Sequence, residues 1–296
     1  MAKRKQSSKP DTLQDAPENE AGTRQGPASE DSGSEDDTDM LNVDFEWFDP
    51  QPEHDFHGLK ILLRQLFDVD SQLFDLSSLT DLILSQPLLG STVKVEGNES
   101  DPYAFLTVIN LHEHREKQII KDLTSHIVRK ASSSNSLSHL SELFTPESTA
   151  QVGLILTERL INVPSEVVPP MYNMLLEEMS WAVDEKEPYT FSHYLIISKS
   201  YTEVASALEQ EDTRPQKKVR KAGTNTEPFY FHPEDEVLQR HAKGYDSFPF
   251  TKEEGTSDSK RAFQELGIKP QGHMILIEAA QFRDAVTAVA KFLNPN

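Results

Sequence analysis

The sequence predicts a single mixed α/β domain that follows a disordered acidic arm. Residues 1–41 contain almost no large apolar side chains and consist mainly of Ser, Glu, Asp, Gly, Pro and Lys, so this segment cannot bury enough surface to offset its chain entropy. Residues 42–296 instead alternate strand-like and helix-like apolar patterns. No internal stretch is rich enough in Pro and Gly to divide them, which favours one domain with a central mixed sheet flanked by helices.

The arm contains two charge blocks. The first, MAKRKQSSK, is basic and is either a nuclear-import signal or solvated charge. The second, EDSGSEDDTD, is acidic, and phosphorylation of Ser32 or Ser34, each three positions before a carboxylate, would make it more so. Its centre supplies three candidate contacts for a basic partner: Glu35, Asp36 and Asp37.

The segment NVDFEWFDP is the first expected strand. Val43, Phe45 and Trp47 alternate with the residues between them, so they form one face of an extended strand, and we expect this face to pack on the core. The opposite face carries Asp44 and Glu46, which we expect to be available to a partner.

Two helices and a hairpin are expected next. In LKILLRQLF the leucines recur at i, i+3, i+4 and i+7, which indicates one face of a helix entered through His57 and Gly58. A second helix is expected after SLTD, residues 78–81, which resembles a capping box. STVKVEG and YAFLTVINL, separated by the turn-forming GNESDP, predict neighbouring strands. Helices at about 115–131 and 136–143 follow, and then the apolar strand VGLILTERL.

The second half continues this alternation. Pro169 and Pro170 suit the first turn of a helix. Its expected buried face consists of Tyr172, Leu175, Leu176 and Met179. YTFSHYLIISKSY is rich in β-branched and aromatic residues, which is typical of a strand. FYFHP, EDEVLQRHA and HMILIEA predict a strand, a short helix and a strand, and a last helix has apolar residues at i, i+4, i+7 and i+11 from Phe282.

A polar stretch at about residues 209–227 is expected to be an exposed basic loop. It has no apolar periodicity, and loops this long within a domain are usually functional or disordered. It contains KKVRK, the densest basic cluster of an acidic chain. The four basic residues are either solvated or a nuclear-import signal: Lys217, Lys218, Arg220 and Lys221.

The sequence lacks the signatures of catalysis. No two of the 12 glycines lie within three positions of each other, so neither GxGxxG nor the glycine-rich acyl-coenzyme loop of acetyltransferases is present. GxSxG is absent, and a chain without cysteine has no thiolate nucleophile and no zinc finger. The pairs His54 with His57 and His112 with His114 are better explained as solvated or capping side chains than as metal ligands. We expect no catalytic residue, no cofactor and no metal.

The charge balance restricts the expected partners. With 49 acidic and 29 basic side chains, the formal net charge is -20, so the chain repels phosphate backbones and anionic membranes and attracts basic polypeptides. We therefore expect no direct nucleic-acid or membrane partner. The absence of a long apolar run and of a signal sequence predicts a soluble intracellular protein. An acidic surface at PEDE supplies further candidate contacts: Glu234, Asp235 and Glu236.

Generic packing alone does not explain the residues of six segments: NVDFEWFDP, DFHGLKILLRQLF, ESDPYAFLTVINL, VGLILTERLINVPSEVVPPMYNMLLEE, FSHYLIISKSY and FYFHPEDEVLQRHA. In this order they resemble the BCCIP family, whose fungal members are called Bcp proteins, from about Asn42 to the C-terminal helix. The resemblance implies a domain similar to the GNAT acetyltransferase fold, without acetyltransferase function.

The resemblance also implies a function. Family members are described as nuclear chaperones and export factors, and the fungal clients are a large-subunit ribosomal protein and a phosphatidylinositol 4-phosphate 5-kinase. We therefore expect a monomeric nuclear protein that shuttles to the cytoplasm. Its expected partners are these clients and nuclear transport receptors. Two alternatives stay open: an acyl-coenzyme A dependent N-acetyltransferase on the same fold, and a scaffold in DNA repair or cell-cycle control.

Overall fold

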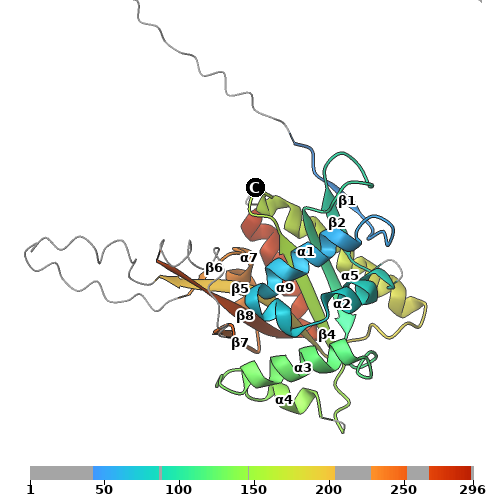
Figure 1. Ribbon diagram of the computed structural model, residues 1–296. Helices are drawn as coiled ribbons and strands as arrows, with labels where there is room; N and C mark the ends of the chain where they lie inside the picture. The colour runs from blue at the N-terminus through green and yellow to red at the C-terminus, as the bar shows by residue number, and fades with distance from the viewer. Residues whose placement is uncertain (1–42, 87–88, 146, 204–227, 252–266, 295–296) are drawn as a thin grey trace, which may run out of the picture. The chain divides into compact units, whose positions relative to one another are not determined.

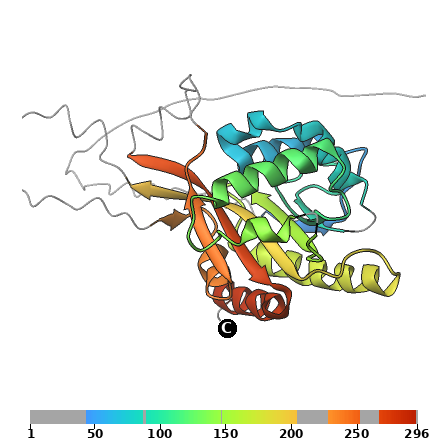
Figure 2. The ribbon, with the colours of Figure 1, turned by 90° about the horizontal axis from the view of Figure 1, so that it is seen from below.

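A computed structural model shows, among the residues that it describes, an eight-stranded mixed sheet with helices on both faces (Figures 1 and 2). The structure describes residues 43–86, 89–145, 147–203, 228–251 and 267–294. The described residues from Val43 onward form one compact unit. The expected arm at 1–41 and the expected basic loop at 209–227 lie outside the described residues. The mixed α/β class is confirmed.

The sheet has the strand order β1-β2-β3-β4-β5-β8-β7, and β6 pairs with β5 beside this path. The strands are β1 (Glu46–Phe48), β2 (Ser91–Lys94), β3 (Ala104–Asn110), β4 (Val152–Arg159), β5 (His193–Glu203), β6 (Phe229–Tyr230), β7 (Gly244–Phe248) and β8 (Ile268–Glu278). β4 and β5 are parallel, whereas the other described ladders are antiparallel. The expected hairpin is confirmed, because Val93 of β2 lies opposite Ala104 of β3.

The helices form two layers, one on each face of the sheet (Figure 2). One layer contains α1 (Phe56–Phe67), α2 (Leu76–Leu84), α3 (Gln118–Ala131) and α4 (Leu140–Leu143), and the other contains α5 (Val168–Asp184), α7 (Glu234–Gln239) and α9 (Ala279–Leu293). Two 3-10 helices, η1 (Asp68–Leu73) and η2 (Ser165–Val167), precede α2 and α5. No helix in the described part of the chain is long and apolar enough to span a membrane.

The first two helices confirm the periodicity of the sequence. The expected inner face of α1 is buried: Leu59, Leu62, Leu63 and Leu66. Gly58 lies against Pro102, whose Cδ would be 2.3 Å from an added Cβ, so a larger residue does not fit without displacement. α2 begins before the predicted Ser78, because Asp75 is its N-cap and its Oδ1 accepts the backbone N–H groups of Ser77 and Ser78.

The later elements differ from the predictions mainly in length. Pro169 and Pro170 do lie in the first turn of α5, and of its expected inner face only Leu176 is not fully buried. α3 and α4 are shorter than predicted. β8 begins at Ile268, five residues before the predicted segment, because it pairs along the whole of β5. The edge strand β7, with the mainly polar sequence GYDSF, was not predicted.

β1 forms, but its expected core face is only partly buried. Val43 is 47% exposed and Trp47 is 37% exposed, so the prediction that both pack in the core is wrong. Phe45 is half-buried and packs edge-on against Tyr103. The physical reason is position: β1 is an edge strand that pairs with β2 alone, so neither of its faces is fully covered.

A buried ion pair connects β2 to the chain that follows β1. Lys94 Nζ lies 2.7 Å from Asp55 Oδ1, and both side chains are 0% exposed. The ammonium also donates to the carbonyl of Asn98 and lies 5.6 Å from the ring centroid of Phe48, while Asp55 Oδ2 accepts the N–H of Gln51. This network attaches the β1 segment to the sheet.

Candidate functional site

A buried polar network lies where β4 and β5 separate. Their ladder extends to Leu156 opposite Ile197, and β5 then pairs with β6. Beyond that point Glu158 of β4 contacts two basic side chains: Lys199 Nζ lies 2.6 Å from its Oε2 and His232 Nε2 lies 3.1 Å from its Oε1. Side-chain contacts, such as that between Glu158 and Lys199, therefore connect β4 and β5 beyond the end of their ladder.

The same network attaches α7 to the sheet. Ser198 Oγ donates to Asp235 Oδ2 at 2.5 Å and lies 3.3 Å from His232 Nδ1. Arg159 binds Glu234 through two hydrogen bonds, of 2.5 and 3.1 Å. Glu234 and Asp235 are buried, so the predicted acidic surface at PEDE is wrong for both residues, because cations and hydroxyls of the sheet take up their carboxylates.

The charges of this network depend on each other. Burial would raise the pKa of Glu158, but the hydrogen bond and charge of His232, together with Lys199, lower it to about 2. Burial would lower the pKa of His232, but Glu158 raises it above its ordinary value. Burial raises the pKa of Asp235 to about 7. The network therefore contains an ionised carboxylate that contacts Lys199 and His232, next to a carboxyl group that resists ionisation.

Ser198, His232 and Glu158 resemble a hydrolytic triad in composition, but their arrangement does not support catalysis. The Ser198 side chain is buried, with 1% of the residue exposed, and its hydroxyl donates to Asp235 instead of to a base. A nucleophile has to reach a substrate and lose its proton to the base. The described geometry provides neither condition, so we assign this cluster a structural role.

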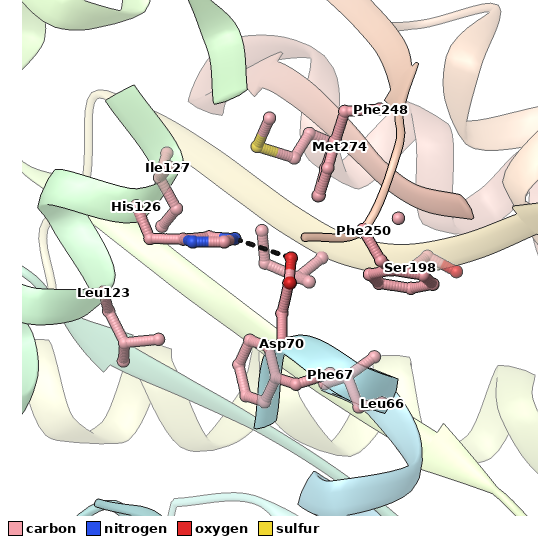
Figure 3. A pocket seen from close by; sticks show the side chains of 12 residues that line it. Leu66, Phe67, Asp70, Leu123, His126, Ile127, Ser198, Phe248, Phe250 and Met274 are labelled. Atoms are coloured by element: carbon pink, nitrogen blue, oxygen red, sulfur yellow. Dashed lines mark ion pairs between the residues drawn. The ribbon is translucent and has the colours of Figure 1, made fainter. Parts of the chain in front are cut away.

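A second buried cluster lines a small cavity between η1, α3 and the chain after β7 (Figure 3). Asp70 points to His126, with 3.3 Å between Oδ2 and Nε2, and Lys130 Nζ lies 3.5 Å from the same oxygen. Asp70 Oδ1 accepts the N–H of Thr251 at 2.7 Å. Burial would raise the pKa of Asp70, but its hydrogen bonds with His126 and Thr251 and the charge of Lys130 lower it to about 2.

This cavity is too small for an organic substrate. Its volume of about 10 Å³ corresponds to a single water molecule. Its walls are mainly apolar: Leu66, Phe67, Leu123, Ile127, Phe248 and Met274. Asp70 and its partners therefore hold the chain around Thr251 against the helical layer.

A surface groove of about 450 Å³ runs beside α3 and α4. Its apolar floor includes Ile120 and Phe144, and its rim carries Arg115, Glu116 and Lys121. The rim charges pair with each other, since Glu116 lies 3.0 Å from Lys121 and 3.9 Å from Arg115. The groove thus has room for a ligand but has no nucleophile and base in contact among its described lining.

An acidic surface extends from the β1 segment to α5. We define the β1–α5 acidic surface by Asp44, Glu46, Asp49, Glu177 and Glu178. Asp44 and Glu46 are exposed, as predicted from the alternation of the strand. The two segments are in contact because the Trp47 indole N–H donates to the Val167 carbonyl at the start of α5.

Within the β1–α5 acidic surface, Asp49 and Glu177 repel the charge of Glu178. Burial raises the pKa of Glu178 to about 7, and the charges of Asp49 and Glu177 act in the same direction. The hydrogen bond from the Gly90 N–H, at 2.8 Å, partly opposes the shift. A cationic partner would relieve this repulsion, and for that reason we take the surface as the candidate functional site.

The remaining predicted site residues fall into two groups. Glu236 on α7 is exposed. Glu35, Asp36, Asp37 and the four basic residues at 217–221 lie outside the described residues. In the described part of the chain, no group of three or more His, Asp or Glu side chains is placed to hold a metal ion, and His112 instead lies 3.4 Å from the Arg115 guanidinium.

The buried carboxylates and their cations were not predicted as a network, although the sequence contains a signal for it. Lys94, Arg159 and Lys199 lie in strands whose other residues are mostly apolar, aromatic or β-branched. A charged residue in such a strand requires a buried partner. The signal shows that partners exist, but it does not identify them.

Comparison with known proteins shows close relatives over most of the chain. The BCCIP family model matches residues 40–238. Protein bcp1 of Aspergillus fumigatus is 63% identical over 268 residues, which cover 90% of this chain and 92% of that protein. Protein bcp1 of Emericella nidulans is 61% identical over 298 residues, which cover 100% and 99%.

One solved structure is also similar. The crystal structure of BCP1 from Saccharomyces cerevisiae has a TM-score of 0.58 and 26% sequence identity, and the match covers 88% of this chain and 92% of that chain. The names of these relatives are not enzyme names. The family model, the fungal relatives and the solved structure agree with the ordered sequence segments, and the chain belongs to the BCCIP family.

Proposed function

We propose that the protein is a non-enzymatic chaperone and transport adaptor that binds basic client proteins. The observation that carries the proposal is the formal net charge of -20. Long-range attraction speeds the encounter with a basic protein, while apolar contacts supply specificity. A free ribosomal protein exposes Lys and Arg side chains that neutralise RNA in the ribosome, so an acidic carrier can cover them until RNA displaces it.

The distribution of carboxylates supports this proposal. Inside the domain Asp55, Glu158 and Glu234 are each paired with a cation. At the surface Asp44 and Glu46 are exposed and are not in the described salt bridges. Only the exposed groups have charge to offer to a partner.

The proposed clients follow from the family resemblance. They are a basic large-subunit ribosomal protein, in ribosome biogenesis, and a phosphatidylinositol 4-phosphate 5-kinase, in nuclear export. The proposal includes nuclear transport receptors as partners, a nuclear location with shuttling to the cytoplasm, a monomeric state, and no direct contact with nucleic acid or membrane.

The likeness to the GNAT fold belongs to the same proposal, and the mixed sheet between two helical layers is compatible with it. Acyl transfer is not favoured, since the sequence has no glycine-rich coenzyme loop. Calorimetry with acetyl coenzyme A decides this point: we expect no heat of binding, and saturable binding would favour the acyltransferase.

Affinity purification of the tagged full-length chain from fungal extract, followed by mass spectrometry, tests the clients. We expect a large-subunit ribosomal protein or the lipid kinase among the bound proteins, with less recovered as ionic strength rises. Recovery of neither client at low salt would reject this part of the proposal.

A fluorescent fusion tests the import signal. Replacement of Lys217, Lys218, Arg220 and Lys221 by alanine should move the protein from the nucleus to the cytoplasm. The matched control replaces the basic residues of MAKRKQSSK, the other candidate signal. Unchanged nuclear fluorescence in the first variant would exclude the loop as the import signal.

A further inference from the structure

The last turns of α5 present an exposed tryptophan to solvent. Trp181 is 61% exposed and Val183 is 40% exposed, although the opposite side of this helix packs on the sheet. A single exposed apolar residue is ordinary on a protein surface. Tryptophan, however, is among the residues that contribute most to binding when a partner covers them.

Three exposed carboxylates lie within one turn of this ring. Glu177 precedes Trp181 by four residues, and Asp184 and Glu185 follow it by three and four. At these spacings Glu177 and Asp184 lie beside Trp181 on the same side of the helix, and Glu185 caps the helix end next to it. Any segment that covers the indole therefore meets negative charge on both sides along the helix axis.

The carboxylates at this helix end act against the stability of the helix. The C-terminal end of a helix carries partial negative charge, which favours Lys, Arg or His in the last turn. The last turn of α5 contains no basic residue and ends at Asp184, with Glu185 as its C-cap. Local helix energetics does not account for Asp184 and Glu185, whereas binding of a cation does.

We propose that this face of α5, formed by Glu177, Trp181, Asp184 and Glu185, binds an arginine-containing cationic segment of a client protein. The inference rests on the proposed function and deepens it, because it assigns that function a docking surface. We call these four residues the α5 docking face.

Arginine fits the α5 docking face better than lysine does. A guanidinium group is planar, stacks on an indole ring and offers paired N–H donors to a carboxylate, so one arginine can contact Trp181 and Glu177 together. An ammonium group is more strongly hydrated and binds a carboxylate only as a point charge. A second copy of this chain does not fit the face, because two surfaces of like charge repel each other.

The α5 docking face is next to the β1–α5 acidic surface. Glu177 belongs to both, and its charge acts on Glu178 together with that of Asp49. A cationic segment that lies on Trp181 can therefore continue toward the β1 segment over carboxylates.

Tryptophan fluorescence of the full-length chain tests the inference. The chain has two tryptophans, so the Trp47→Phe variant leaves Trp181 as the only reporter. We titrate it with an oligoarginine peptide and with an oligolysine peptide of equal length at physiological ionic strength. We expect the oligoarginine to bind more tightly and to shift the Trp181 emission to shorter wavelength as water leaves the ring.

Substitutions then separate the ring from the charges. In calorimetric titrations Trp181→Ala should weaken oligoarginine binding by about 2- to 5-fold and remove the preference over oligolysine. The matched control is Phe292→Ala, which removes a half-exposed aromatic residue from α9 on the same side of the sheet. This control should leave both affinities unchanged.

The charges give a readout that a purely structural role would not produce. The double variant Asp184→Asn, Glu185→Gln should raise the midpoint of thermal unfolding, because it removes unfavourable charge from a helix end, and should weaken oligoarginine binding. The control Glu142→Gln removes an exposed carboxylate from the first turn of α4, on the other face of the sheet. This control should not raise the midpoint of thermal unfolding, and it should leave oligoarginine binding unchanged.

Two results would overturn the inference. One is equal affinity for the two peptides with no effect of Trp181→Ala, and the other is a loss of binding in Glu142→Gln as large as that in the Asp184, Glu185 double variant. Client purification distinguishes this failure from failure of the proposed function. If the unmodified chain and Trp181→Ala recover the same basic proteins, the docking face is wrong and the function stands, whereas an unmodified chain that recovers no basic protein contradicts the function itself.

Discussion

The buried ion pair between Lys94 and Asp55 allows a quantitative test of the fold. Its atoms are 2.7 Å apart and both side chains are 0% exposed. Lys94→Met keeps most of the apolar stem but leaves Asp55 as an uncompensated buried charge, which should destabilise the fold by about 3–5 kcal/mol. In a protein of this size 1 kcal/mol corresponds to about 2–4 °C, so the unfolding midpoint should fall by about 6–20 °C.

Circular dichroism during thermal and urea unfolding of the full-length chain measures this effect. The matched control is Lys243→Met, because Lys243 and Glu278 are also 2.7 Å apart but their side chains are 39% and 49% exposed. An exposed pair should contribute less than about 1 kcal/mol. Asp55→Asn added to Lys94→Met should recover much of the lost stability, since it removes the unpaired charge. Equal destabilisation by Lys94→Met and Lys243→Met would show that burial of the Lys94–Asp55 pair adds nothing to its effect on stability.

Three further predictions concern stability. The pKa values of Asp70 and Glu158 are lowered to about 2 from 3.8 and 4.5. The stability that these two carboxylates contribute is therefore complete above pH 4.5 and should be lost as the pH falls toward 2. Urea unfolding that is independent of pH between 4.5 and 2 would contradict this prediction. Gly90→Ala should destabilise by about 1 kcal/mol or more, because Gly90 has φ +103° and an added Cβ would lie 2.6 Å from a backbone carbonyl oxygen; unchanged urea unfolding would contradict this. Trp47→Ala should lower the free energy of unfolding by only about 1 kcal/mol, since the ring is partly exposed and loses one hydrogen bond to Val167. Loss of the folded domain in thermal unfolding of this variant would instead show that Trp47 has a core role.

The helices of this domain were predictable because their apolar residues repeat at short range. The leucines of α1 lie at i, i+3, i+4 and i+7, and all four are buried. A local pattern is sufficient here, because one helix face packs against one sheet face. A second local signal, the preference of proline for the first turn of a helix, placed the start of α5 at Pro169 and Pro170.

The buried polar network could not be predicted, because its partners are far apart in the sequence. Glu234 and Asp235 appear in a polar segment, PEDE, that suggests a solvated surface. Their partners Arg159 and Ser198 lie 75 and 37 residues away. Residue type alone does not distinguish a solvated carboxylate from one that is neutralised by a distant cation.

The edge strands show a second limit of sequence patterns. Alternation in the β1 segment correctly separated the exposed Asp44 and Glu46 from the apolar residues, but it did not show that Trp47 would lie at the sheet edge. β7 has few of the side chains that mark strands, and its position depends on pairing with β8, for example Phe248 opposite Gly272. Pairing partners decide such strands, and a local pattern does not contain them.

In the proposed function, electrostatic attraction brings basic clients to this protein. Its most direct test is equilibrium binding of the full-length chain to a purified basic large-subunit ribosomal protein, measured from low to physiological ionic strength. We predict a micromolar or tighter complex, with a binding free energy of roughly -8 kcal/mol or better, that weakens as salt rises. No binding at low ionic strength, or an affinity that does not change with salt, would contradict it.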